Sequence, residues 1–209
     1  MSKNNQNSLD SKVNVSRETD SKLKQYEALL NKWQKALNIV SPSTLADSKI
    51  RHFDDSLQIL PLLPENTKTL YDLGSGGGFP GMVLAIAAPD VSVSLIESDR
   101  KKCSFLSSVS RETKSSANVV NARVESSDLP APDVITARAL ADLKTLMGWC
   151  LKWAEENPDL VLIFPKGRAV QQEITQAQVD YNFEYKEIPS ETSAEATIII
   201  VYKLALKTA

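Results

Sequence analysis

The sequence is poor in several residue types that carry well-known chemistry. It has one histidine, two cysteines and seven glycines among 209 residues. Cys103 and Cys150 make neither a disulfide framework nor a cysteine-based metal site, so we expect no bound metal and a reducing, cytoplasmic location. No apolar run approaches the roughly 20 residues that a membrane-spanning helix needs, and the N-terminus has no apolar signal segment. We therefore expect no membrane partner.

An excess of charge of one sign is missing as well. The formal net charge is −2 and the pI is about 5.6, whereas general nucleic-acid binders usually carry a basic footprint. Any contact with a nucleic acid should therefore depend on a few local cations. The composition, 42% hydrophobic and 24% charged, suffices for one good core. We expect one main domain and a monomer.

The N-terminal part of the chain predicts a tail followed by a helical extension. Residues 1–15 are polar, which is typical of a mobile tail. Within the extension, residues 16–64, apolar side chains recur at helical steps, namely Leu23, Tyr26, Leu30, Trp33 and Leu37. Thr44 to Asp47 form a candidate capping box for a second helix that ends at Pro61 or Pro64.

Residues 65–209 predict an α/β domain. Strands are expected over Thr69–Leu73, Val91–Glu97, Asn118–Val120, Asp133–Thr136 and Leu160–Phe164, and helices over Pro80–Ala88, Arg100–Thr113, Leu140–Glu156 and Ala169–Tyr181. Such alternation favours a parallel sheet covered on both faces. Two final strands, Phe183–Ile188 and Thr197–Leu204, have no helix between them and predict an antiparallel hairpin at one edge. The expected sheet is mostly parallel and seven-stranded.

Five of the seven glycines lie between Gly74 and Gly81, directly after the first strand. Glycine allows positive φ and a close approach of backbone to a ligand, and ligands bind beyond the carboxyl ends of such strands. Gly76, Gly78 and Gly81 satisfy the dinucleotide pattern G-x-G-x-x-G. However, Asp72 precedes them, and a carboxylate suits a ligand with an ammonium group better than a diphosphate. The spacing Asp72-x-Gly74-x-Gly76-x-Gly78 resembles the first motif of class I S-adenosylmethionine-dependent methyltransferases, which are Rossmann-like.

The second strand ends in another carboxylate, Glu97. An acid at this place can accept hydrogen bonds from both ribose hydroxyls of an adenosine, which would serve a nicotinamide cofactor equally well. After the third strand come residues 121–125, and in methyltransferases of this class that turn lies along the adenine.

More of the chain resembles one family, the bacterial small-subunit ribosomal RNA guanine-N7 methyltransferases, called ribosomal RNA small subunit methyltransferase G or glucose-inhibited division protein B. The matching segments are Lys32–Ser41, Arg51–Leu57, Asp72–Gly81, Arg123–Glu125, Ile135–Ala139 and Lys166–Gly167. The first two are the most specific, because generic methyltransferases lack them. The resemblance implies methyl transfer from S-adenosylmethionine to N7 of a guanine in 16S ribosomal RNA, with that RNA or a ribosomal particle as partner.

The resemblance also implies site residues. Five residues would contact the cofactor or the transfer site, namely Gly74, Phe79, Val124, Glu125 and Arg138. Together with residues of the glycine loop and of the strand ends, they make up the expected cofactor set, which is Asp72, Gly74, Gly76, Gly78, Phe79, Glu97, Val124, Glu125 and Arg138. Arg138 lies just past the fourth strand and is the candidate catalytic residue, which would orient the guanine or a phosphate. Guanine N7 has a free lone pair, so no general base is expected.

The expected RNA contacts are three cations, Arg51, Lys166 and Arg168. Asp55 is interpreted as an internal partner that fixes its helix. His52 has no evident acid–base partners and is interpreted as a satisfied helix residue more readily than as a catalytic base. Whether the basic run Arg100 to Lys102 is a solvated helix face or a phosphate site stays open.

Two other functions remain possible from the sequence. One is an S-adenosylmethionine-dependent methyltransferase of another RNA or of a small molecule, which the N-terminal helices and the cations near the loop disfavour. The other is a non-catalytic RNA-binding protein, which the intact glycine loop disfavours.

Overall fold

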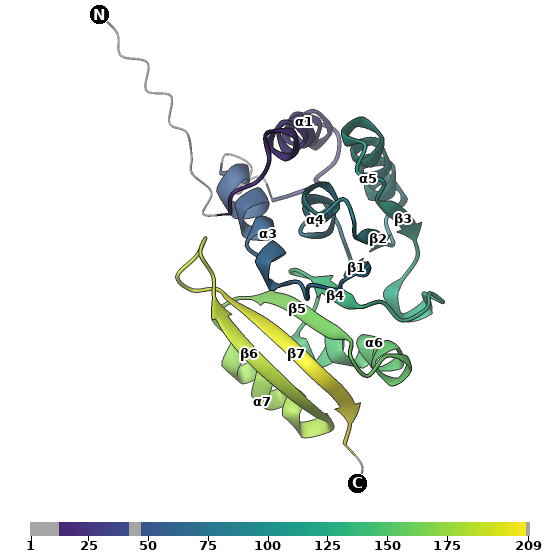
Figure 1. The fold of residues 1–209 in the computed structure, drawn as a ribbon, viewed down its shortest axis with the longest axis vertical. Coiled ribbons are helices and arrows are strands. Elements are labelled where there is room, and N and C mark those ends of the chain that lie inside the picture. Colours follow the sequence, from purple (N-terminus) through teal and green to yellow (C-terminus); the bar gives the residue numbers. More distant parts are fainter. Residues whose placement is uncertain (1–12, 42–46, 208–209) are drawn as a thin grey trace, which may run out of the picture.

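The computed structural model describes residues 13–41 and 47–207. Its strands form one sheet in the order β3-β2-β1-β4-β5-β7-β6 (Figure 1). Their bounds are β1 Thr69–Leu73, β2 Ser92–Glu97, β3 Asn118–Asn121, β4 Val134–Ala137, β5 Val161–Lys166, β6 Tyr181–Pro189 and β7 Thr197–Leu206. Strands β1 to β5 are parallel, and β7 is antiparallel to both β5 and β6. The predicted mostly parallel sheet and C-terminal antiparallel hairpin are confirmed.

Helices cover both faces of this sheet. They are α1 Arg17–Gln34, the π-helix η1 Lys49–Asp54, α3 Asp55–Leu57, η2 Leu60–Leu62, α4 Gly81–Ala87, α5 Arg100–Thr113, η3 Val124–Ser126, α6 Leu143–Glu156 and α7 Val170–Asp180. Three of them begin where a side chain accepts from otherwise unpaired N–H groups: Ser16 caps α1, Asp99 caps α5 and Asp142 caps α6.

Two hydrophobic clusters fill the space between sheet and helices, one on each face. Alternate residues of β1 supply both, because successive strand side chains point to opposite faces. Leu70 belongs to the cluster under α1, α4 and α5, whereas Tyr71 and Leu73 belong to the cluster under α6 and α7. Figure 1 shows this layering, with α1, α4 and α5 on one side of the sheet and α6 and α7 on the other.

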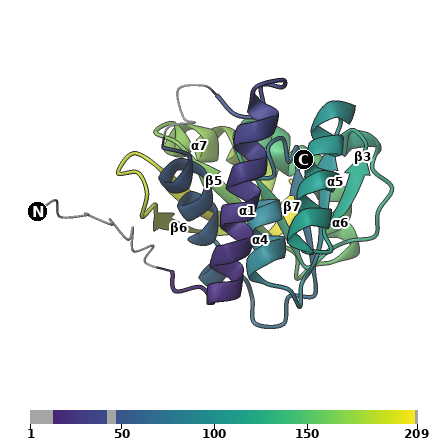
Figure 2. The ribbon, with the colours of Figure 1, turned by 90° about the horizontal axis from the view of Figure 1, so that it is seen from above.

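Helix α1 forms an outer layer over α4 and α5 (Figure 2). Its predicted apolar stripe is confirmed as far as Trp33, since Leu23, Tyr26 and Leu30 are buried and Trp33 packs against the same core. The helix ends at Gln34, so Leu37 lies beyond it. Helix α4 is buried from Gly81 to Ile86 because it lies between the sheet and α1. The N-terminal extension therefore shares its core with the sheet domain.

The second predicted helix differs from the observed structure. Its described part is a π-helix over Lys49–Asp54 and short turns as far as Leu62. Pro61 interrupts regular helix there because it lacks an N–H group. The proposed capping box at Thr44, the residue Leu45 and most of the predicted tail lie outside the described residues. Val13 and Val15, from the end of that tail, pack against the core.

The helix expected from Leu140 begins only at Leu143. Ala139 has a φ of 53°, a conformation that L-residues seldom adopt, and Asp142 accepts from Thr145 N to start the helix. Residues 138–142 thus form a separate rim segment between β4 and α6. Strands β1 and β4 are neighbours at the centre of the sheet, where the chain order reverses, and this is where doubly wound sheets bind ligands.

Candidate cofactor and acceptor cleft

A cleft of about 690 Å³ opens at the carboxyl ends of the central strands. Its walls come from the glycine loop after β1, the end of β2, the rim segment after β4, residues 39–41 and 51–55 of the N-terminal extension, and the tip of the β6–β7 hairpin. We call the part formed by the glycine loop and β2 the cofactor half. The part formed by the rim segment, residues 51–55 and the hairpin tip is the acceptor half.

The glycine loop owes its shape to positive φ angles at Gly74, Gly76 and Gly78, which are 60°, 54° and 87°. Gly76 N donates to Glu97 Oε2 at 2.8 Å, so the loop is tied to the end of β2. Gly74 and Gly76 line the cleft. Gly78 is different, because a Cβ there would come within 2.5 Å of the Tyr26 hydroxyl oxygen. Both its φ of 87° and the close approach of α1 therefore require glycine at position 78, which does not line the cleft.

Tyr26 links α1 directly to the glycine loop. Its hydroxyl donates to the Gly77 carbonyl oxygen, and its ring stacks on Phe79 with centroids 5.3 Å apart. Burial raises the pKa of this phenol well above its usual value, so the hydroxyl keeps its proton and remains a donor. The sequence identified Tyr26 only as a member of an apolar stripe.

Glu97 lies in the cofactor half, as expected. Its two carboxylate oxygens accept from Gly76 N at 2.8 Å and from Asp99 N at 2.7 Å. A carboxylate has about four lone-pair sites, so two acceptor sites remain for ribose hydroxyls. The Glu97 side chain lines the cleft with little of its surface exposed.

Asp72 lies near the end of β1, behind the glycine loop. It is fully buried and is not among the cleft-lining residues. Thr136 Oγ1 donates to Oδ1 at 2.8 Å, and Oδ2 has no hydrogen-bond partner among the described residues. A Cβ at Gly81 would come within 2.4 Å of Asp72 Cβ, so the carboxyl group sits under the start of α4. The expected contact of Asp72 with the cofactor's amino group stays a prediction. Burial raises the pKa of Asp72 to about 6.

The predicted adenine contacts lie in and beside η3. Val124 is buried and packs in the cluster under α6 and α7, whereas the Glu125 side chain is exposed. Neither is among the residues that line the cleft, and their contact with adenine stays a prediction.

Arg138 is held from three directions in the acceptor half. Its Nη1 donates to Asp55 Oδ2 at 2.9 Å and to Arg51 O at 3.0 Å, and its Nη2 lies 3.0 Å from His52 Nδ1. The guanidinium carbon is 5.3 Å from the centre of the Phe79 ring, a distance at which a cation and an aromatic face attract each other. Three of its five N–H groups are thereby used, and none of the described residues accepts from the other two.

Asp55 is an internal partner, as predicted, but it fixes more than its own helix. Its Oδ2 binds Arg138, while its Oδ1 accepts from Thr192 Oγ1 at 2.6 Å and from Gln58 Nε2 at 2.8 Å. Gln58 Oε1 accepts in turn from Glu191 N at 2.8 Å. Nothing in the sequence pointed to Thr192 or Gln58, because both act through contacts that only folding creates.

His52 packs its ring on Phe79, with centroids 5.0 Å apart. Burial, together with the Arg138 charge, lowers the pKa of His52 to about 4. The imidazole is therefore neutral at physiological pH, with Nδ1 placed to accept from Arg138. Its partners agree with the interpretation of His52 as a satisfied residue.

The three predicted RNA-binding cations have different surroundings. Arg51 is exposed and lines the cleft. Arg168 is exposed and pairs with Glu195 at the hairpin tip. Lys166 has only 8% of its side chain exposed, and its ammonium binds Glu173 Oε2 and Ala141 O, both at 2.8 Å. It thus supports the rim segment from inside, which argues against a phosphate contact.

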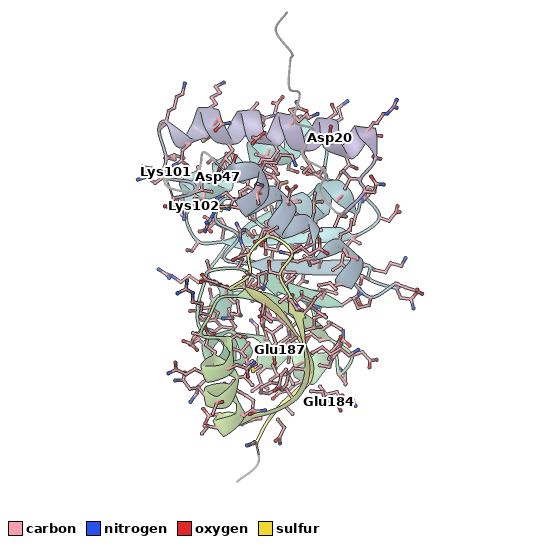
Figure 3. The ribbon with its side chains drawn as sticks, turned by 90° about the vertical axis from the view of Figure 1, so that its left-hand side faces the viewer. Asp20, Asp47, Lys101, Lys102, Glu184 and Glu187 are labelled. Atoms are coloured by element: carbon pink, nitrogen blue, oxygen red, sulfur yellow. The ribbon has the colours of Figure 1, made fainter. Side chains whose placement is uncertain are left out.

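The basic run at the start of α5 contributes one cleft residue, Lys102. Figure 3 shows Lys101 and Lys102 projecting from the same side of the molecule, well away from Glu184 and Glu187 on β6. Lys102 therefore adds a cation to the cofactor half, whereas the sequence left the role of this basic run undecided.

The donor and acceptor groups of the cleft fit an adenosine-bearing cation. Glycine backbone approaches the cleft on one side, a free acceptor capacity remains on Glu97, and Phe79 offers an apolar surface. In the described ranges, 13–41 and 47–207, no group of three or more histidine, cysteine or carboxylate side chains could hold a metal ion. Nor is any helix of these ranges long and apolar enough to cross a bilayer.

Comparison with known proteins gives one consistent family. Residues 19–198 match the GidB model, described as rRNA small subunit methyltransferase G. The ribosomal RNA small subunit methyltransferase G of Rhodospirillum centenum is 45% identical over 192 residues, which cover 91% of this chain and 87% of that protein. Its counterpart in Gluconobacter oxydans is 44% identical over 187 residues, covering 90% and 95%.

Solved structures match the fold at much lower identity. A methyltransferase from Aquifex aeolicus, described as dependent on S-adenosylmethionine, superposes with a TM-score of 0.58 at 12% identity, covering 78% of this chain and 98% of that one. This likeness shows the class I methyltransferase fold, which the glycine motif predicts.

Proposed function

The chain belongs to the ribosomal RNA small subunit methyltransferase G family, and from this premise we propose that it methylates N7 of a guanine in small-subunit ribosomal RNA. S-adenosylmethionine is the methyl donor of this family. One observation carries the proposal beyond the shared fold. The family-like segment over residues 51–55 holds Arg138 in the cleft, directly beside the cofactor half.

The cofactor half would hold S-adenosylmethionine through backbone and side chains together. Gly74 and Gly76 allow the backbone to approach the ligand, and Glu97 has lone pairs left for the ribose hydroxyls. Phe79 would cover an apolar part of the ligand, and Val124 and Glu125 would meet the adenine. Asp72 adds a negative charge behind the loop, which favours a cationic ligand when the carboxyl is ionised. When bound, the cofactor supplies a methyl group activated by a sulfonium.

The acceptor half would orient the guanine. Arg138 has two uncommitted N–H groups, which can donate to O6 of the base or to an RNA phosphate. They should not donate to N7, because that lone pair must stay available for methylation. N7 loses no proton on reaction, so the acceptor half has no need of a general base. Neutral His52 is accordingly a neighbour that holds Arg138 in place, and proximity and alignment supply much of the rate.

The RNA would approach over the cleft rim, which Arg51 and Lys102 line, and would meet the exposed Arg168 after this side chain leaves Glu195. The Lys166 ammonium already binds Glu173 and Ala141 O, so Lys166 would support the rim segment. A few cations of this kind suit a protein of slightly negative charge, and each phosphate contact should contribute roughly 0.7–0.9 to the log–log salt slope of binding. Action on ribosomal RNA also agrees with the expected cytoplasmic location, and the monomeric state stays a prediction.

The test measures transfer of a tritiated methyl group. Purified protein and labelled S-adenosylmethionine are incubated with naked small-subunit ribosomal RNA, with the small ribosomal particle, and with an extract of small metabolites. We expect label in one of the two RNA samples, and chain scission by reduction and aniline at the labelled site, which is diagnostic of 7-methylguanine. Label only in metabolites, or label in RNA without such scission, would refute the N7 proposal.

A further inference from the structure

The tip of the β6–β7 hairpin reaches into the site through one side chain. Thr192 Oγ1 donates to Asp55 Oδ1 at 2.6 Å, across a separation of 137 residues in the chain. Thr192, Ser193 and Ala196 of this tip also line the cleft. The hairpin thus both borders the acceptor half and touches the residue that holds Arg138.

A second side chain fastens the same contact. Gln58 Nε2 donates to Asp55 Oδ1 at 2.8 Å, and Gln58 Oε1 accepts from Glu191 N at 2.8 Å. Gln58 is buried, with 6% of its surface exposed. Its amide therefore connects the residue before Thr192 to the carboxylate that Thr192 itself binds.

The two carboxylate oxygens of Asp55 bind different partners. Oδ2 faces Arg138, and Oδ1 faces the hairpin. A carboxylate is planar, so hydrogen bonds that fix Oδ1 also fix the direction of Oδ2 and hence the plane of the guanidinium. Both members of the ion pair are largely buried, with 17% of the Arg138 side chain and 16% of the Asp55 side chain exposed, which leaves little water to replace a lost partner.

We propose that Thr192 is a positioning residue for methyl transfer, which orients Arg138 through Asp55 from the tip of the hairpin. This inference rests on the proposed role of Arg138 in the acceptor half. The hydrogen bonds of Thr192 join it to Asp55, Gln58 and Ser190, and among the described residues none joins it to the cofactor half or to the guanidinium. Its loss should therefore misalign the acceptor and leave cofactor binding intact.

The first experiment replaces the hydroxyl by a methyl group of the same shape. Thr192→Val should lower the single-turnover methylation rate about 5- to 10-fold, less than the full effect of losing one hydrogen bond to a charged group, because the change reaches Arg138 only through Asp55. The Kd for S-adenosylmethionine should change less than 2-fold. Thr192→Ser restores the hydroxyl and should return the rate to within 2-fold of wild type. Thr197→Val is the matched control, since it makes the same change on the same hairpin outside the cleft.

A double-mutant cycle distinguishes positioning from general damage. In an Arg138→Lys background the guanidinium fork is absent, so Thr192→Val should lower the remaining rate less than 2-fold. Gln58→Met removes the other donor to Asp55 Oδ1 with little change in side-chain size. It should lower the single-turnover rate as Thr192→Val does, and it provides a second measurement if Thr192→Val folds poorly.

The outcomes separate this inference from the proposed function. A wild-type rate in Arg138→Lys would overturn the role of Arg138 and the inference with it. A large loss in Arg138→Lys, combined with a wild-type rate in Thr192→Val or with equal losses in both backgrounds, would overturn the positioning role of Thr192 alone.

Discussion

The two halves of the cleft are built by different means. In the cofactor half, the key contact joins Gly76 and Glu97, which are 21 residues apart, and one of the two groups is backbone. In the acceptor half, Arg138 and Asp55 are 83 residues apart, and Asp55 and Thr192 are 137 apart, and all three act through side chains. The first half depends on local conformation, and the second depends on packing of distant segments.

This difference separates features that many proteins of this fold share from features that are specific to this substrate site. A strand, a glycine turn and an acid on the next strand define a cofactor site in many proteins of this fold. The acceptor half needs residues 51–55 and the hairpin, which bring the substrate-specific part of the machinery to the same edge. Changes in the acceptor half should therefore act on the rate of transfer, and changes in the cofactor half on affinity and folding.

The largest expected effect tests the acceptor half. Arg138→Ala should lower the single-turnover rate by roughly 10²–10³-fold, or about 3–4 kcal/mol, the usual cost of removing one oriented donor from a transition state. The Kd for S-adenosylmethionine should change much less. A loss of cofactor affinity that matches the loss of rate would show that the two halves are not separate.

His52→Gln is the control for that measurement. Its side-chain oxygen can accept from Arg138 as Nδ1 does, so most of the rate should remain. Because the pKa of His52 is lowered to about 4, the wild-type single-turnover rate should be nearly flat from about pH 6.5 to 8.5. A log-linear rise with pH that disappears in His52→Gln would reveal a general base and contradict N7 as the acceptor.

The next effect concerns the charge buried behind the cofactor half. A carboxyl whose pKa in the folded protein is raised binds its proton more tightly than in the unfolded chain, so stability falls as the pH rises from about 4 to about 6. Asp72→Asn removes this charge. The free energy of unfolding of Asp72→Asn relative to wild type should rise by about 2–3 kcal/mol between pH 4 and pH 8.

Urea titrations of both proteins at the two pH values measure this difference. A constant offset between variant and wild type would show that Asp72 titrates normally. At pH 8 the variant should also bind S-adenosylmethionine more weakly, because the negative charge behind the loop is gone.

The direct contact of the cofactor half gives a smaller effect. Glu97→Ala should weaken S-adenosylmethionine binding by about 1–3 kcal/mol, the loss expected for removing a charged acceptor, as measured by calorimetry on the folded variant. Glu155→Ala, at an exposed position on α6, serves as the control. An unchanged affinity in Glu97→Ala would remove this carboxylate from the site.

The smallest effect tests the hydrogen bond between Tyr26 of α1 and the glycine loop. Tyr26→Phe removes the hydrogen bond to the Gly77 carbonyl oxygen and should cost about 1 kcal/mol of stability. Tyr185→Phe makes the same change on β6, where the side chain is more exposed, and should have no measurable effect. Equal denaturation midpoints for the two variants would show that α1 does not stabilise the loop through this bond.

The sequence by itself determined the sheet, its C-terminal hairpin and the cofactor half. The alternation of strand and helix segments predicted the sheet, and the helical spacing of apolar residues predicted α1. Glycines 74, 76 and 78 marked the turn where positive φ was needed. These features depend on residues that are close together in the chain, so the sequence alone is enough to predict them. The sequence did not predict the π-helical geometry of η1 or the separate 3-10 turn of η2.

Only the tertiary structure decided how the charged residues are used. Arg138, Asp55 and Lys166 were all recognisable as polar residues near strand ends or in family-like segments. The sequence could not show that Lys166 turns inward to Glu173, that Asp72 lies behind the loop, or that Thr192 meets Asp55. Each of these outcomes depends on which partner comes within about 3 Å after folding. The partners lie 7, 64 and 137 residues away in the chain, and no periodic pattern in the sequence marks them.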